Sequence, residues 1–138
     1  MSLYMFLACE EKLEEMENKG IYFDRGKGTL HMENEDALGN IVIREEQRFE
    51  DAENYTKKKN IAEINWIYTR ERAEEFLEYI KNQFNRAKEI EIWRVWMDEV
   101  SDPKVYEVSV DELDKGLLKE VFDKNYYNGP ECIKVNNY

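Results

Sequence analysis

The middle of the chain carries a strand–helix–strand pattern, which constrains the fold more than any other feature of this sequence. Residues 61–68 have the period-two pattern of a strand, with one face that is apolar throughout. The side chains on this face are Ala62, Ile64, Trp66 and Tyr68. Thr69 then stands at a helix N-cap position, and apolar residues recur at helical spacing from Ala73 to Ala87. We therefore predict a strand followed by a long amphipathic helix over residues 69–87.

The segment that follows this helix is apolar on both faces. Along residues 89–97, one face carries Ile90, Ile92 and Trp96, and the other carries Trp93, Val95 and Met97. A strand of this kind normally lies inside a sheet that is covered on both sides. Strand, helix and strand in this order predict a right-handed crossover that joins two parallel strands.

The rest of the chain predicts short strands joined by tight turns. The segments with strand character are 4–8, 21–23, 29–32, 41–43, 105–108 and 132–135. Tight turns favour antiparallel pairing, and the glycine-containing loop at residues 24–28 predicts a hairpin. Residues 49–60 are polar and compatible with a short helix, which the sequence does not decide. The sequence therefore predicts a single α+β domain over residues 1–138, with a mixed, mostly antiparallel sheet.

Two further helices are expected from shorter patterns. Residues 10–18 hold two apolar side chains three positions apart and are followed by Gly20, which suits a short helix. Ser109 and Glu112 fit a capping box ahead of an apolar series at residues 113–122. We therefore predict a shorter C-terminal helix in that segment.

Composition and charge narrow the class of protein. The chain of 138 residues is 42% apolar and 13% aromatic, which is enough for a core, and no apolar run approaches the ~20 residues of a membrane span. Its 20 basic and 31 acidic residues give a net charge of −11, spread over both halves of the chain. Such a surface repels phosphate backbones, so nucleic-acid binding is disfavoured. Two distant cysteines without an export signal predict a cytoplasmic protein with reduced thiols.

Metal and nucleophile chemistry have little support in the sequence. Zinc sites need several His or Cys ligands at defined spacings, whereas this chain has one histidine, His31, and two distant cysteines, Cys9 and Cys132. A cysteine–histidine pair would need a tertiary contact that the sequence does not define. The acidic residues between Asp98 and Asp102 suit a solvated turn better than a Mg²⁺ or Ca²⁺ site. We expect no metal and no cofactor.

Large aromatic and polar side chains on the two central strands form the main candidate binding site. Its members are Asn65, Trp66, Trp93, Arg94 and Trp96. One interpretation is an aromatic-walled pocket in which Asn65 and Arg94 orient a ligand or hold a partner. The other interpretation is a core of large side chains whose indole N–H groups are bonded locally. The sequence leaves both interpretations open.

Two glutamates lie in the same apolar strands, where a charged side chain needs a reason. Glu63 or Glu91 would act as a general acid or base if it pointed into a cavity beside the aromatic side chains. The alternative is that each faces solvent or pairs with Arg94 across strands, because charged residues are mostly exposed.

These features favour a non-enzymatic module that binds a protein or a ligand. One version is an inhibitor or immunity-type protein that covers a basic partner. The alternative is a small-molecule-binding enzyme that uses Glu63 or Glu91 beside an aromatic pocket. A third hypothesis is that the protein forms a homo-oligomer. Its two-fold interface would be lined by Trp93, Val95 and Met97 if no helix covers that face. No motif in the sequence identifies a protein family.

Overall fold

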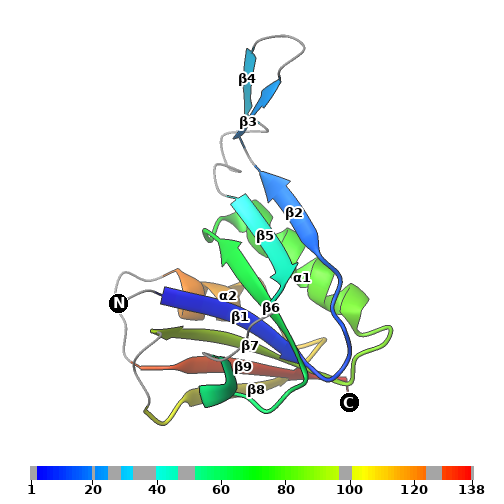
Figure 1. The fold of residues 1–138 in the computed structure, drawn as a ribbon, viewed down its shortest axis with the longest axis vertical. Coiled ribbons are helices and arrows are strands. Elements are labelled where there is room, and N and C mark those ends of the chain that lie inside the picture. Colours follow the sequence, from blue (N-terminus) through cyan, green and yellow to red (C-terminus); the bar gives the residue numbers. More distant parts are fainter. Residues whose placement is uncertain are drawn as a thin grey trace.

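The computed structural model describes residues 3–19, 21–24, 29–32, 40–46, 52–96, 101–123 and 129–137. The strands within these residues are β1 (Leu3–Cys9), β2 (Met16–Lys19), β3 (Ile21–Asp24), β4 (Thr29–Met32), β5 (Asn40–Glu45), β6 (Asn60–Trp66), β7 (Glu89–Trp96), β8 (Lys104–Ser109) and β9 (Glu131–Asn136). The helices are α1 (Arg70–Gln83), α2 (Lys115–Phe122) and the 3-10 helix η2 (Ala52–Asn54). Seven strands form one sheet in the order β2-β5-β6-β1-β7-β9-β8 (Figure 1). The predicted α+β class is therefore confirmed.

The predicted strand, helix and strand all form, and one further strand is inserted between the two strands of the unit. β1 pairs antiparallel with β6 on one side and with β7 on the other. Strands β6 and β7 therefore run parallel to each other, with α1 between them in the chain and β1 between them in the sheet. The other neighbouring strands pair antiparallel, except that β8 and β9 are parallel. The insertion of β1 was not predictable from local patterns.

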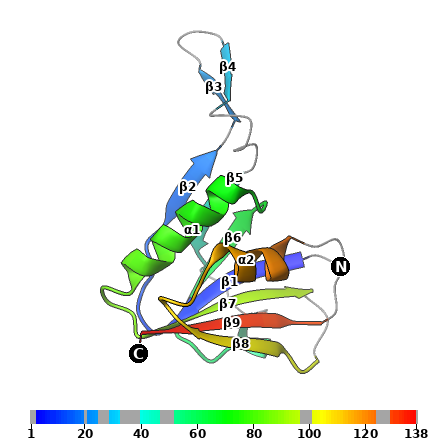
Figure 2. The ribbon, with the colours of Figure 1, turned by 180° about the vertical axis from the view of Figure 1, so that it is seen from behind.

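The larger core lies between the sheet and the two α-helices, which cover the same side of the sheet (Figure 2). Its fully buried members include Leu7, Ile43, Ile64, Ile92 and Ile133 from the strands and Phe76, Ile80, Leu118 and Val121 from the helices. The predicted inner face of residues 61–68 is confirmed, because Ala62, Ile64 and Trp66 all belong to this core. This core is the main source of hydrophobic stabilisation, which scales with the apolar area removed from water.

Helix α1 begins where the sequence predicts and ends earlier. Thr69 is its N-cap, and its hydroxyl oxygen accepts a hydrogen bond from the backbone N–H of Arg72 at 3.2 Å. At the other end, the N–H of Phe84 bonds to the carbonyl of Lys81 at 3.2 Å, so the chain tightens into turns after Gln83. The predicted helix over residues 69–87 therefore includes four residues that form these turns and the approach to β7.

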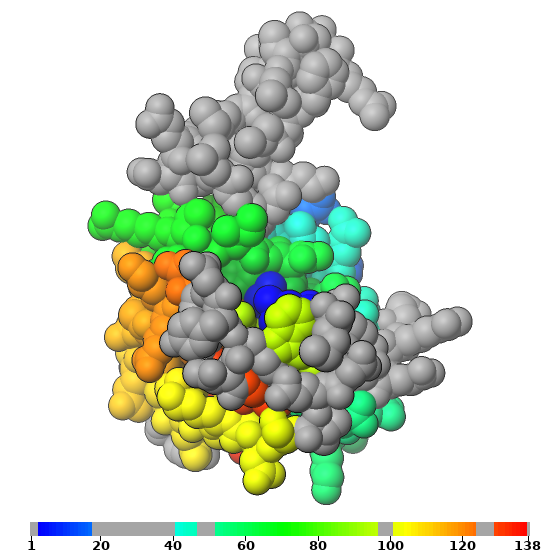
Figure 3. All heavy atoms as spheres, turned by 90° about the vertical axis from the view of Figure 1, so that its left-hand side faces the viewer, coloured from blue at the N-terminus to red at the C-terminus, as the bar shows by residue number. Residues whose placement is uncertain are grey.

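A second, smaller core covers the opposite face of the sheet. It contains Tyr4, Phe6, Ala8, Ala52, Ile61, Trp93, Val95 and Cys132, with Tyr55 packed against it. Figure 3 shows α2 (orange) and the segment that contains η2 (blue-green) on opposite sides of β1 and β7. The prediction that β7 is covered on both sides is confirmed, because six of its eight residues are buried.

One local prediction is wrong, and the predicted C-terminal helix forms with a later start. Residues 10–15 form no helix, and residues 16–19 are strand β2, because pairing with β5 and hydrogen bonds from α1 to the backbone of Glu14 replace local helical bonds. Ser109 and Glu112 make both bonds of a capping box, at 3.0 and 3.3 Å, around a turn rather than at a helix start. Helix α2 begins later, with Asp114 as its N-cap.

The predicted hairpin is confirmed as β3 and β4, which form a separate two-stranded sheet beyond the end of β2 and β5 (Figure 1). Its loop at residues 25–28 lies outside the described residues. Among the described residues, no helix is long and apolar enough to cross a membrane.

Candidate functional site

The two buried tryptophans of the predicted site lie on opposite faces of the sheet. Trp66 is 7% exposed and packs in the helix-side core, with its ring centroid 5.1 Å from Phe76 and 5.3 Å from Phe122. Trp93 is 5% exposed and stacks on Phe6 in the opposite core, at a centroid distance of 5.9 Å. These two side chains therefore do not line a common pocket.

The remaining three residues of the predicted site are also separated. Arg94 is buried on the helix side of β7, where the strand register sets it opposite Met5 and Glu131. Trp96 is half-buried at the end of β7, and Asn65 is exposed on the face opposite Trp66. The structure brings only Asn65 and Trp66 to one hollow, which is described below.

The two strand carboxylates have different surroundings. Oε1 of Glu91 accepts hydrogen bonds from the hydroxyl of Thr56 at 2.6 Å and from the indole N–H of Trp93 at 3.0 Å. Glu63 is exposed, and the register sets it opposite Arg44. Glu91 and Arg94 lie on opposite faces of β7, so a cross-strand pair between them does not form.

The two cysteines are buried and separate from each other. Burial raises the pKa of the Cys9 thiol to about 11, and this thiol donates to a carboxylate oxygen of Glu11 at 3.3 Å. Burial also raises the pKa of the Cys132 thiol above its usual range. Because the thiolate is the nucleophile, protonated thiols in these positions are poorly reactive at neutral pH.

Metal-ligating side chains do not gather in the described part of the chain. Within it, no group of three or more His, Cys, Asp or Glu residues is placed to hold a metal ion. Asp98 and Glu99 of the acidic turn lie outside the described residues, as does Met97 of the predicted oligomer interface.

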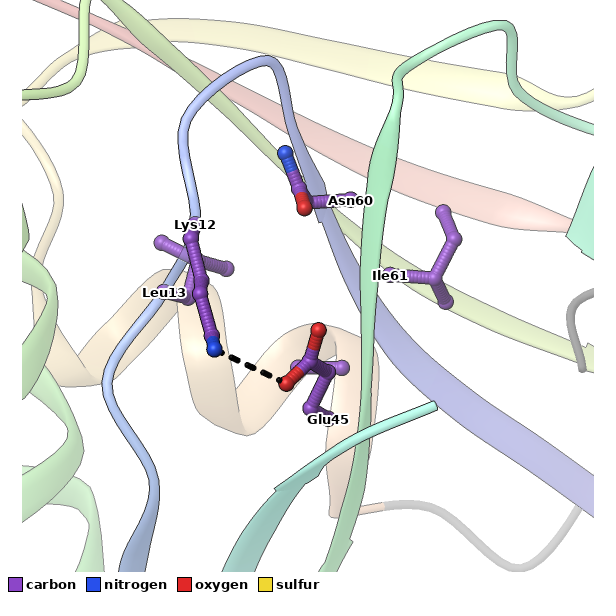
Figure 4. A pocket seen from close by; sticks show the side chains of 6 residues that line it. Lys12, Leu13, Glu45, Asn60 and Ile61 are labelled. Atoms are coloured by element: carbon purple, nitrogen blue, oxygen red, sulfur yellow. Dashed lines mark ion pairs between the residues drawn. The ribbon is translucent and has the colours of Figure 1, made fainter. Parts of the chain in front are cut away.

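The surface of the described residues has several hollows that differ in size. A small hollow lies beside the start of β6 and is lined by Lys12, Leu13, Glu45, Asn60, Ile61 and Ala62 (Figure 4). Its volume is about 10 Å³, and an ion pair of 3.3 Å between Lys12 and Glu45 crosses it. A space of this size holds about one water molecule, so it is not a ligand site.

A larger hollow of about 330 Å³ lies at the end of β6. It is lined by Val42, Asn65, Trp66 and Ile67. Ile67 is 68% exposed, and among the described residues the buried indole N–H of Trp66 has no acceptor. Neither Glu63 nor Glu91 lines this hollow.

The largest of these hollows, which we name the acidic groove, has a volume of about 400 Å³ and lies between α1 and the segment that leads into β2. It is lined by Glu14, Glu15, Met16, Glu75, Glu78, Tyr79, Asn82 and Gln83. Four carboxylates therefore border one concave surface, together with the apolar side chain of Met16 and the ring of Tyr79. The sequence signal that could have found it is the polar stripe of Glu75, Glu78 and Asn82 at helical spacing on α1.

Hydrogen bonds from α1 fix the shape of the acidic groove. The hydroxyl of Tyr79 donates to the carbonyl oxygen of Glu14 at 2.6 Å, and Oε1 of Gln83 accepts from the N–H of Glu14 at 3.1 Å. Burial raises the pKa of the Tyr79 hydroxyl, so this donor keeps its proton at neutral pH. On the strand side, a carboxylate oxygen of Glu15 accepts from the N–H of Glu45 at 3.0 Å. Both walls are therefore held in place by hydrogen bonds between side chains and the main chain.

The charges around the acidic groove leave an excess of negative charge. Glu75 pairs with the buried Arg72 at 2.7 Å, and Glu14 is 3.7 Å from Arg86 in an exposed pair. Glu78 is exposed and makes no hydrogen bond or ion pair with the residues that the structure describes. The C-terminal end of a helix adds partial negative charge, and the groove lies along the last turns of α1.

A neighbouring hollow extends this surface along β2. It has a volume of about 230 Å³ and is lined by Glu15, Met16, Glu17, Ile43 and Arg44. The two hollows share Glu15 and Met16, so they adjoin each other at the start of β2.

Comparisons of the chain with protein-family models, with curated proteins and with solved structures find no match. The geometry and charge of the chain itself are therefore the basis for inferring its function.

Proposed function

We propose that this protein is a non-catalytic binding module whose acidic groove receives a basic segment of a partner protein. The observation that carries the proposal is a groove with a volume of about 400 Å³ that is bordered by four carboxylates. The net charge of the whole chain is −11. A protein of this charge attracts basic partners over long range, and complementary charge raises association rates.

The chemistry of the groove suits lysine and arginine side chains. Their aliphatic stems can pack on the half-buried Met16, while their charged ends reach the carboxylates at the rim. Each exposed ion pair contributes about 0.2–1 kcal/mol, so useful affinity requires several pairs at once. Glu78 is the first carboxylate to test, because its replacement breaks no hydrogen bond or ion pair within the described part of the protein.

Binding is better supported than catalysis by the surroundings of the reactive groups. Both thiols are buried with a raised pKa, and the carboxylate of Glu91 is held by Thr56 and Trp93. None of these groups lines the acidic groove. The groove itself offers carboxylates, two amides and a phenol, all of which recognise cations by hydrogen bonding.

The test is a titration with a basic peptide. A peptide of about eight residues with lysine at every second position is titrated by calorimetry at about 50 mM and about 300 mM salt. We expect binding that weakens strongly at the higher salt concentration. The Glu78→Lys variant should bind about five- to tenfold more weakly, equivalent to about 1–1.4 kcal/mol.

The matched control is Glu120→Lys, which makes the same charge change at an exposed position of α2. It should change affinity by less than about twofold, because surface charges at long distance are screened. Equal weakening by both variants would show a general charge effect and would contradict a site at the groove.

A second candidate function is the binding of a small uncharged molecule in the hollow beside Asn65 and Trp66. It is supported by the exposed Ile67 and by the buried indole N–H of Trp66, which lacks an acceptor among the described residues. Fragment screening by tryptophan emission tests it, with Trp66→Phe as the control. The enzyme alternative would also need Glu63 or Glu91 beside the bound molecule, and neither lines this hollow.

A further inference from the structure

The seven-stranded sheet ends at β2, beside the acidic groove. Within the described part of the chain, β5 is the one strand that pairs with β2. The outer edge of a terminal strand presents main-chain N–H and C=O groups to which another extended chain can bond. The acidic groove and the neighbouring hollow are both lined by Glu15 and Met16, at the start of this strand.

We propose that the basic segment of the partner binds in an extended conformation and adds an eighth strand to the sheet along β2. This inference rests on the proposed function, because it specifies how the same partner is held. Main-chain hydrogen bonds to β2 would supply affinity that does not depend on sequence, and the acidic groove would select basic side chains.

The geometry of a strand defines the sequence pattern of the partner. Side chains of an added strand point alternately to the two faces of the sheet. Those on the helix side face the acidic groove, where Glu75 and Glu78 of α1 border the space next to Met16. The partner segment should therefore carry lysine or arginine at every second position and no proline. With four residues in β2, the paired length is about 13 Å at ~3.3 Å per residue.

Charge distinguishes this edge from the other end of the sheet. The edge strand β8 carries Lys104, Val105 and Glu107 as exposed side chains, and the ammonium group of Lys104 lies 4.8 Å from the centre of the Tyr106 ring. Its charges are therefore mixed, and none of the hollows described above lies along it. Strand β2 itself also carries mixed charge, with Glu17, which pairs with Arg44 at 2.9 Å, and Lys19. The four carboxylates of the acidic groove, and not the strand, therefore distinguish this edge for a basic segment.

The experiment uses two versions of one basic peptide, in which lysine and valine alternate. Each version carries backbone N-methyl groups at alternate residues, and the two versions are offset by one residue. In an added strand, alternate N–H groups point toward the sheet edge and the others point to solvent. We expect one version to lose at least about tenfold in affinity for the full chain, while the other binds within about twofold of the unmodified peptide.

Amide hydrogen exchange gives an independent readout. On binding of the unmodified peptide, the outward-facing amides of residues 16–19 should exchange more slowly, whereas those of β8 should not change. Equal binding by both methylated peptides, with unchanged exchange in β2, would overturn strand addition and leave the proposed function intact. If no basic peptide binds at low salt, the proposed function and the strand addition both fail.

Discussion

One row of side chains crosses the face of the sheet opposite the α-helices, and its buried centre differs from its exposed ends. The strand register aligns Arg44, Glu63, Phe6, Trp93, Cys132 and Val105 from β5 to β8. Phe6, Trp93 and Cys132 are buried under the segment with η2 and Tyr55, whereas Arg44 and Glu63 are exposed. The centre of the sheet is thus covered on both faces. Toward β2, the sheet carries the exposed charged side chains of Arg44 and Glu63. We infer that the centre provides stability and that the β2 side is available for binding.

The largest expected effect is in the covered centre. Trp93→Ala should lower the free energy of unfolding by about 3–5 kcal/mol, because it removes a ring that contacts Phe6 and Tyr55 and leaves a cavity. Glu63→Ala on the same row should change it by no more than about 0.5 kcal/mol. Urea denaturation followed by circular dichroism measures both values. Similar losses in the two variants would contradict the difference between centre and side.

Glu91 bonds to Thr56, which follows the η2 segment that covers the smaller core. Replacing Glu91 tests how strongly this segment is attached to the sheet. Glu91→Ala removes the acceptor of the Thr56 hydroxyl and of the Trp93 indole, both of which are buried contacts. We expect a loss of about 1–3 kcal/mol in the free energy of unfolding, because two buried donors lose their partner. Glu91→Gln keeps one oxygen acceptor and should lose less. An unchanged free energy of unfolding in Glu91→Ala would show that ring packing alone holds the η2 segment on the sheet.

Alkaline pH should weaken the covered centre through its thiols. Burial raises the pKa of Cys9 from 9.0 to about 11, so the folded protein holds this proton more tightly than the unfolded chain does. The stability contributed by the thiol is fully present below about pH 9 and is lost as the pH rises through about 11.

The measurement compares unfolding free energies at about pH 8 and about pH 10.5 in the wild type and in Cys9→Ala. The variant has a lower baseline because of the lost packing, so only the pH-dependent difference is compared. We expect a smaller decrease with pH in Cys9→Ala than in the wild type. Identical decreases would show that the Cys9 proton makes no contribution.

The elements near the middle of the chain could be predicted because their signals are local. The alternation of residues 61–68, the N-cap at Thr69 and the helical spacing that follows are all set by neighbouring residues in the sequence. The strand β7 was predicted for the same reason. The hairpin of β3 and β4 was predicted from its short loop.

The acidic groove could not be predicted because tertiary contacts create it. Leu13 and Met16 have helical spacing, yet Tyr79 and Gln83 of α1 bond to the backbone of Glu14 and hold this segment in an extended form. The separation of Trp66 from Trp93 is a consequence of strand order, since β1 inserts between their strands. Local patterns describe which face is apolar but not which strands become neighbours.

The smallest expected effect on stability is at the β2 side. Glu78→Lys should change the free energy of unfolding by no more than about 0.5 kcal/mol, because Glu78 is exposed and makes no bond with the described residues. Thermal denaturation of this variant beside Glu120→Lys checks the value. A loss comparable to that of Trp93→Ala would mean that the groove is part of the stable centre and not a free binding surface.

The most direct test of the account is to map, by NMR, where a basic peptide contacts the protein. The alternating lysine–valine peptide is added to the isotope-labelled full chain, and shifts of the backbone amides are recorded. We predict the largest shifts in residues 14–19 and along the groove side of α1, with small shifts in β8 and α2. Shifts that are absent, that centre on β8, or that an acidic peptide of the same length reproduces would contradict the acidic groove as the binding site.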